Sequence, residues 1–97
     1  GARLTVAPRG EIDHHSARSL RERIDSALYS ARPEVLVLDL SHIDFMDSSG
    51  LGLIMGRHTL MTSLGGTLTL RRPNERIVRI FKLAGLERIV SIEEGKA

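Results

Sequence analysis

Two adjacent serines, Ser48 and Ser49, stand between an acid, Asp47, and a glycine, Gly50, in the middle of the chain. They follow a strand-like apolar run and open a helix-like segment, so their hydroxyls are expected at a helix N-terminus. The unpaired N–H groups and partial positive charge of such a terminus favour anions. A serine there can cap the helix, act as a nucleophile or accept a phosphoryl group. These three alternatives need different surroundings.

The nucleophile alternative requires a glycine two residues before and two residues after the serine, as in the sharp turn of many hydrolases. Before Ser48 that position holds Met46, and around Ser49 the two positions hold Asp47 and Leu51. The spacing of the sequence brings no histidine base within reach of either hydroxyl. We therefore expect a protein that is not an enzyme.

Phosphate-loop and metal chemistry are also disfavoured. The glycines Gly50, Gly52 and Gly56 are wrongly spaced for a dinucleotide loop, and no Gly-Lys pair is followed by a hydroxyl residue. We expect them to allow close approach of another backbone. His14 and His15 would diverge by about 100° on a helix, which is unsuitable for a metal pair. The chain has no cysteine. No cofactor and no metal are expected.

Capping and phosphorylation both remain open on the residues alone. A cap at Asp47 or Ser48 contributes about 1 kcal/mol, but it accounts for only one polar residue of the cluster. A phosphoserine would add about −1.5 to −2 charges, which the helix terminus tolerates. The new anion would stand beside Asp47 and near the acidic loop that contains Asp13. Phosphorylation could thus switch the docking of a partner without refolding the domain.

The composition is ordinary for a soluble globular protein, with 97 residues, 41% hydrophobic residues and a net charge of +2. No apolar run approaches the roughly 20 residues of a membrane span, and the chain does not start like a secretory signal. We expect a cytoplasmic protein without a membrane partner. One tyrosine and two phenylalanines are too few for the stacking platforms of a single-strand nucleic-acid binder. No nucleic-acid partner is expected.

Strand and helix periods alternate along the chain. Strands are predicted at 4–7, 35–40, 67–70 and 89–92, and helices at 13–31 with Asp13 as N-cap, at 48–64, and after Pro73-Asn74. The continuous apolar run at 35–40 is typical of a central strand covered on both faces. This alternation predicts an α/β fold with βαβ crossovers and a mainly parallel sheet. The loops at 10–13 and 47–48 follow strands and should converge at one edge.

Two motifs resemble the anti-sigma factor antagonists of the STAS family, most of all the stage II sporulation AA type. They are Gly10–His15 and Phe45–Arg57, with further similarity at Gly65-Gly66 and Phe81–Leu86. The resemblance covers nearly the whole chain. It implies one STAS domain over 1–97, with a mainly parallel mixed sheet and alternating β/α units. The family usually has one more strand before Leu4–Ala7, which this chain is expected to lack.

The resemblance implies a partner switch that controls sporulation transcription. In such proteins the first serine of Asp-Ser-Ser is phosphorylated by an anti-sigma factor that is also a serine kinase, which assigns the acceptor role to Ser48. The unphosphorylated form binds the anti-sigma factor and frees the sigma factor. The phosphorylated form binds poorly, and a serine phosphatase restores it.

The resemblance also implies which residues meet the partner. By position, it places Asp13 and His14 in the docking surface and Asp47, Ser49 and Gly50 around the acceptor serine; to these partner-binding residues we add Leu53 and Arg57 as a hypothesis. Leu53 and Arg57 are expected on the exposed side of the 49–64 helix. One alternative is a general stress-response antagonist with the same chemistry, although the His14-His15 pair favours the sporulation type. Another is a STAS module of a transporter or lipid-trafficking complex, which need not be phosphorylated.

Overall fold

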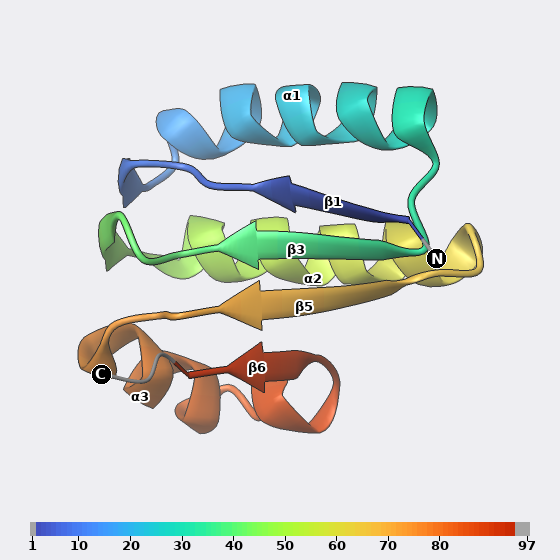
Figure 1. Ribbon diagram of the computed structural model, residues 1–97. Coiled ribbons are helices and arrows are strands. Elements are labelled where there is room, and N and C mark those ends of the chain that lie inside the picture. Colours follow the sequence, from blue (N-terminus) through green and yellow to red (C-terminus); the bar gives the residue numbers. More distant parts are fainter. Residues whose placement is uncertain (1, 95–97) are drawn as a thin grey trace.

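The chain forms a four-stranded sheet with helices on one face and a two-stranded sheet at one end (Figure 1). The computed structural model describes residues 2–94. The larger sheet has the order β1-β3-β5-β6 and contains β1 (Arg3–Val6), β3 (Val35–Asp39), β5 (Thr67–Arg71) and β6 (Ser91–Glu93). The smaller sheet pairs β2 (Gly10–Ile12) with β4 (Ile43–Met46). Every pairing in the described part of the chain is parallel, so the predicted α/β class is confirmed.

The helices are α1 (Ser16–Ala31), α2 (Ser48–Ser63) and α3 (Glu75–Leu83), followed by a short 3-10 turn, η1 (Leu86–Arg88). Helix α1 begins at Ser16, so its predicted start at Asp13 is wrong. The Asp13 carboxylate accepts hydrogen bonds from the backbone N–H groups of His15 and Ser16, each at 2.9 Å, and this holds the preceding residues in a turn. None of the helices within residues 2–94 has the length and apolar character of a membrane span.

The larger sheet is covered by helices on one face only. Side chains alternate between the two faces of a strand, and one set is apolar. The apolar set includes Leu36, Leu38, Leu68 and Leu70. These side chains form a core with Leu28, Ile54 and Phe81 of the helices. In Figure 1 no helix passes in front of β1, β3 or β5, so the expectation that β3 is covered on both faces is wrong. Val37 on the open face is nevertheless buried, and Thr5 and Thr69 flank it in register.

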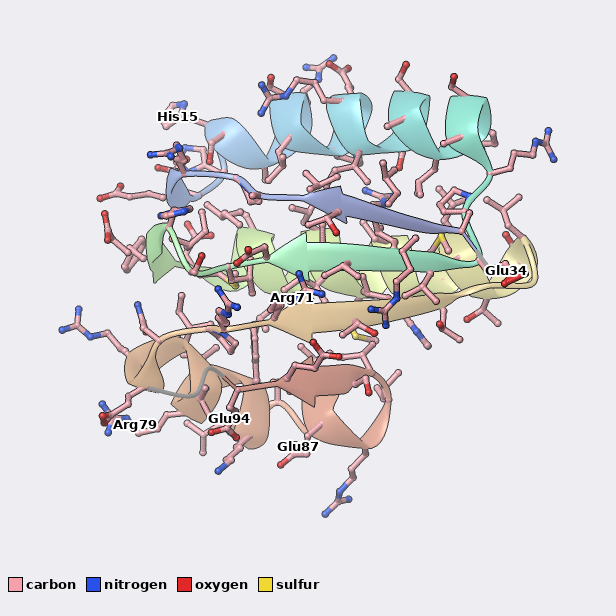
Figure 2. All side chains as sticks on the ribbon, viewed as in Figure 1. His15, Glu34, Arg71, Arg79, Glu87 and Glu94 are labelled. Carbon is pink, nitrogen blue, oxygen red and sulfur yellow. The ribbon has the colours of Figure 1, made fainter. Side chains whose placement is uncertain are left out.

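The open face is polar at the carboxyl ends of its strands. Figure 2 shows Arg71 on this face, and its Nε lies 3.4 Å from Oε1 of Glu93 on the neighbouring strand. Asp39 lies in register with Arg71, which completes a charged row across three strands. Charged and hydroxyl side chains on this face explain why no helix is needed to cover it.

The short strands β2 and β4 were not predicted; residues 10–13 were expected to form a loop. Their pairing is extended by the N–H of Gly10, which donates to the carbonyl of His42 at 2.9 Å, and by the N–H of Asp47, which donates to the carbonyl of Ile12 at 3.2 Å. Because the two strands are parallel and paired, the residues that follow them lie together. The predicted convergence of the Asp13 and Asp47 loops is therefore confirmed.

Candidate functional site

Ser48 is the first residue of α2, and its side chain is exposed. The helix starts there because Asp47, with an extended backbone, is the N-cap. Its carboxylate accepts a hydrogen bond from the N–H of Ser49 at 2.8 Å, and its carbonyl accepts one from the N–H of Gly50 at 2.9 Å. The capping role therefore belongs to Asp47. The Ser48 hydroxyl is presented to solvent at the positive end of the helix.

Gly50 lets the first turn of α2 press against the two-stranded sheet. It is buried, and a Cβ built on it would collide with the side chain of Met46 and come within 3.3 Å of Ile12. Met46 ends β4 and Ile12 ends β2. Close approach of another backbone was expected at this glycine, but it is the side chains of Met46 and Ile12 that lie against Gly50. This contact fixes where Ser48 stands relative to the Asp13 loop.

The Asp13 loop contributes a charged carboxylate beside two exposed histidines. The N–H of Ser16 and then that of His15 hold the pKa of Asp13 below its ordinary value of 3.8, so the carboxylate is ionised near neutral pH. The rings of His14 and His15 lie 4.1 Å apart between centroids and are tilted by 38°. Their predicted divergence is wrong, because both precede α1. Figure 2 shows His15 at the start of that helix.

No group of three or more metal-ligating side chains gathers anywhere in residues 2–94. The two histidines therefore stand without the further ligands that a structural metal site needs.

A groove of about 410 Å³ lies between α1 and α2, beside Ser49 at the start of α2. Its walls include His14, Ala17, Arg18 and Arg21 on the α1 side, and Ser49, Gly52 and Gly56 on the α2 side. A Cβ on Gly52 or Gly56 would meet nothing within 4 Å. Close approach of another backbone was expected at Gly52 and Gly56 as well, and at these two positions it is wrong. They border open space.

Leu53 and Arg57 were expected on the exposed side of α2, and this is wrong. They are only 6% and 8% exposed, because α2 packs beside α1. Leu53 belongs to the apolar core, and Nε of Arg57 lies 3.0 Å from Oδ1 of Asp25 on α1. Burial lowers the pKa of Arg57, while Asp25 opposes this shift. Both residues still line the floor of the groove.

Phe45 is an exposed residue beside the candidate site. From the sequence alone, it was named only as the first residue of the Phe45–Arg57 motif. It lies on β4 just before Met46-Asp47-Ser48, pairs in register with Glu11, and is 44% exposed. An exposed aromatic beside polar groups is a common feature of protein interfaces. Recognising β4 would not have been enough to find it, because burial in this strand does not alternate: Asp44 and Phe45 are exposed, while Ile43 and Met46 are buried.

The profile of the STAS domain matches residues 1–96. The chain belongs to the STAS domain family. The anti-sigma F factor antagonist of Paenibacillus polymyxa is 37% identical over 93 residues, which cover 96% of this STAS domain and 80% of that protein. The anti-sigma-B factor antagonist of Bacillus subtilis strain 168 is 36% identical over 83 residues, which cover 86% of this chain and 74% of the relative.

Solved structures of other proteins have the same fold as this STAS domain. The anti-sigma factor antagonist SpoIIAA in its unphosphorylated form superposes with a TM-score of 0.84 at 25% identity, over 98% of this chain and 81% of that one. The phosphorylated form of SpoIIAA from Bacillus superposes with a TM-score of 0.75 at 25% identity, over 98% and 84%. The family and fold inferred from the two sequence motifs are therefore confirmed.

Proposed function

We propose that this STAS domain is an anti-sigma factor antagonist whose binding is switched off by phosphorylation of Ser48. Unphosphorylated, it binds an anti-sigma factor in the cytoplasm, where transcription takes place, and so frees the sigma factor. The observation that carries the proposal is the exposed Ser48 hydroxyl at a helix start that Asp47 already caps. Two relatives named as anti-sigma factor antagonists support the choice of partner. The domain acts as a regulator and a kinase substrate, not as an enzyme.

The switch consists of one phosphoryl transfer and its reversal. The anti-sigma factor, acting as a serine kinase, transfers the γ-phosphoryl group of ATP to Oγ of Ser48; the hydroxyl proton passes to a base of the kinase and ADP leaves. A serine phosphatase hydrolyses the ester to restore the hydroxyl and release phosphate. The product carries about −1.5 to −2 additional charges. The N-terminus of α2 accommodates that charge within the domain.

Loss of binding follows from the surroundings of the new anion. Asp13 directly follows β2, and Asp47 and Ser48 directly follow β4. Because these two strands are paired, both acids lie near Ser48. A partner surface that fits a neutral hydroxyl among these acids would face a dianion instead. The dianion adds to the negative charge of Asp47 and Asp13, and where it faces like charges on the partner it would cost several kcal/mol of binding free energy. Binding would therefore fall steeply while the fold remains intact.

The proposed docking surface surrounds Ser48. It combines Asp13, His14, Asp47 and Ser49 with Phe45, and it reaches Leu53 and Arg57 through the floor of the groove between α1 and α2. Gly50 acts by letting α2 approach the strands rather than by touching the partner.

The test is phosphorylation by the anti-sigma factor of the same source, with ATP, followed by peptide mapping in a mass spectrometer. We expect label on Ser48 in the wild type and in Ser49→Ala, and none in Ser48→Ala. Ser48→Ala should bind the anti-sigma factor with or without ATP, whereas Ser48→Asp should bind weakly. Label on Ser49, or equally tight binding by the phosphorylated form, would contradict the proposal.

The second candidate is an antagonist of a general stress pathway. It is favoured by the similarity to the anti-sigma-B factor antagonist of Bacillus subtilis, at 36% identity against 37% for the anti-sigma F relative. The switch chemistry would be the same and only the partner would differ. Pull-down with each type of anti-sigma factor, with and without ATP, separates the two; we expect retention by the anti-sigma F type.

A further inference from the structure

The groove between α1 and α2 carries more positive than negative charge. Arg18, Arg21 and Arg57 line it, together with His14. Arg18 is paired with Glu22 only at 3.8 Å and at an exposed position, where ion pairs are weak. Within residues 2–94 Arg21 has no ion-pair partner, and its charge lies close enough to disfavour the charge of Arg57. An anion in the groove would relieve this repulsion.

Arg57 beneath the groove has donors that the fold leaves unused. The separation of 3.0 Å between its Nε and Oδ1 of Asp25 is that of an ion pair, but the N–H is not aligned with the oxygen. Neither Nε nor Nη1 of Arg57 makes a hydrogen bond in the described part of the chain, although both atoms are buried. Buried donors without acceptors are costly and rare. Oδ1 of Asp25, the nearest acceptor, is itself without a hydrogen bond within residues 2–94. Because Arg57 lines the groove, an acceptor oxygen that enters the groove would come next to this side chain.

Two of the α2 positions that line the groove, Gly52 and Gly56, have no side chain. Gly52 and Gly56 lie inside the helix, where glycine is the least favourable residue apart from proline. No neighbour within the domain requires a glycine at either position, because a Cβ would meet nothing within 4 Å. Gly52 and Gly56 are four residues apart, so the space beside them extends along about one turn of α2, next to Ser49. This is room for a segment of another molecule.

We propose that the groove holds an acidic segment of the anti-sigma factor, whose carboxylates meet Arg21 and Arg57 while its backbone passes over Gly52 and Gly56. This inference rests on the proposed function and names the part of the partner that is recognised. Ser49 lines the same groove, so the segment lies directly beside Ser48. Phosphorylation would then set an anion next to partner carboxylates. Their repulsion gives the switch its target.

The test compares charge reversals on one helix. Binding of the anti-sigma factor is measured by calorimetry for the wild type, Arg21→Glu and Arg23→Glu. Arg23 lies on α1 but does not line the groove. We expect Arg21→Glu to weaken binding at least tenfold and to reduce its dependence on salt, whereas Arg23→Glu changes binding less than twofold. Equal effects of the two variants would show that the positive charge of α1 acts only by general electrostatic attraction, and this would overturn the inference.

A second pair of variants tests the space itself. Gly56→Gln should fill the groove and weaken binding at least fivefold, while Thr59→Gln, at an exposed position of the same helix, should leave it unchanged. Thermal melting confirms that each variant folds. Unchanged binding by Gly56→Gln, or a change in self-association instead of partner binding, contradicts the inference. If the wild type itself does not bind the anti-sigma factor, the proposed function fails first, which is a distinct result.

Discussion

Asp47 and Ser48 are adjacent polar residues at the start of α2, and the structure gives them different tasks. The carboxylate of Asp47 accepts the N–H of Ser49 and so satisfies one of the donors that a helix start leaves unpaired. Ser48 is the first helical residue, with its side chain exposed. An acid as cap and a serine after it make the hydroxyl dispensable for the fold. It can be modified without loss of the helix start.

This division predicts opposite consequences for two alanine substitutions. Asp47→Ala should lower the free energy of unfolding by about 1 kcal/mol, because an N-cap is lost. Ser48→Ala should change it by less than about 0.5 kcal/mol, as at an ordinary surface position. Urea denaturation followed by circular dichroism measures both. A larger loss for Ser48→Ala than for Asp47→Ala would show that the serine is the cap.

A second residue-scale prediction concerns pH. The pKa of Asp13 is lower in the folded state than its ordinary value of 3.8, chiefly through the N–H of Ser16. Its carboxylate therefore contributes stability that is fully present above that value and is lost as the pH falls through the folded pKa. The melting temperature of the wild type should fall more steeply below about pH 4 than that of Asp13→Asn. Asp44→Asn, at an exposed position of β4, is the matched control.

Parallel melting curves for the wild type and Asp13→Asn across this pH range would contradict the prediction. Asp39, whose pKa is lowered mainly by the N–H of Ser41, adds a similar dependence to both proteins and does not alter the comparison.

At the scale of the element, the three glycines of α2 have unlike environments. Gly50 faces Met46 and Ile12, whereas Gly52 and Gly56 face the open groove. The spacing of the three glycines in the sequence does not distinguish these environments. Only the packing of the helix on β2, β4 and α1 distinguishes the glycine that the fold requires from those that it does not.

Alanine substitutions should therefore have opposite signs within one helix. Gly50→Ala should destabilise the domain by about 1–3 kcal/mol, since the added Cβ overpacks the contact with Met46. Gly52→Ala should stabilise it by about 0.5–1 kcal/mol, because alanine is the better helix former and meets no neighbour. Chemical denaturation of both variants gives the answer. Destabilisation by Gly52→Ala would mean that its environment is not open.

The elements with long periodic or continuous apolar patterns were predictable. Strand β3 was expected at 35–40 and spans Val35–Asp39; helix α2 was expected to start near Ser48 and does. Strands β2 and β4 contain only three and four residues, too few to establish a period, and their pairing joins residues far apart in the chain. The start of α1 was misplaced because an Asp13 turn and an Asp13 cap have the same sequence signal.

The candidate site was predictable in position but not in exposure. Adjacent strand ends brought Asp13 and Asp47 together, as parallel topology requires. The burial of Leu53 and Arg57 depends on how far α2 is rotated about its axis against α1. That rotation is set by the core and by the pairing of Arg57 with Asp25 on another helix. A single sequence does not reveal such a pair.

At the scale of the molecule, the site and the core occupy different regions. The apolar face of the larger sheet forms the core with the helices that cover it (Figure 1). Ser48 is the first residue of α2 and directly follows β4 and Asp47, at the carboxyl ends of the paired strands β2 and β4. The first turn of α2 touches the strands through Gly50, and Ser48 itself is exposed. A charge added at Ser48 therefore enters solvent rather than the apolar interior.

Phosphorylation should consequently leave the fold unchanged. In ¹⁵N-¹H spectra of the phosphorylated protein we expect shifts at the first turn of α2 and in the 10–15 segment, and none in β5 or α3. The dipole of α2 offsets the new charge, so the melting temperature should change by no more than about 4 °C, equivalent to roughly 1 kcal/mol. Ser48→Ala incubated with the same kinase and ATP is the control. Shifts spread through β5 and α3 would mean that the switch acts by rearranging the core, and binding would then be lost through altered structure rather than through repulsion at an exposed serine.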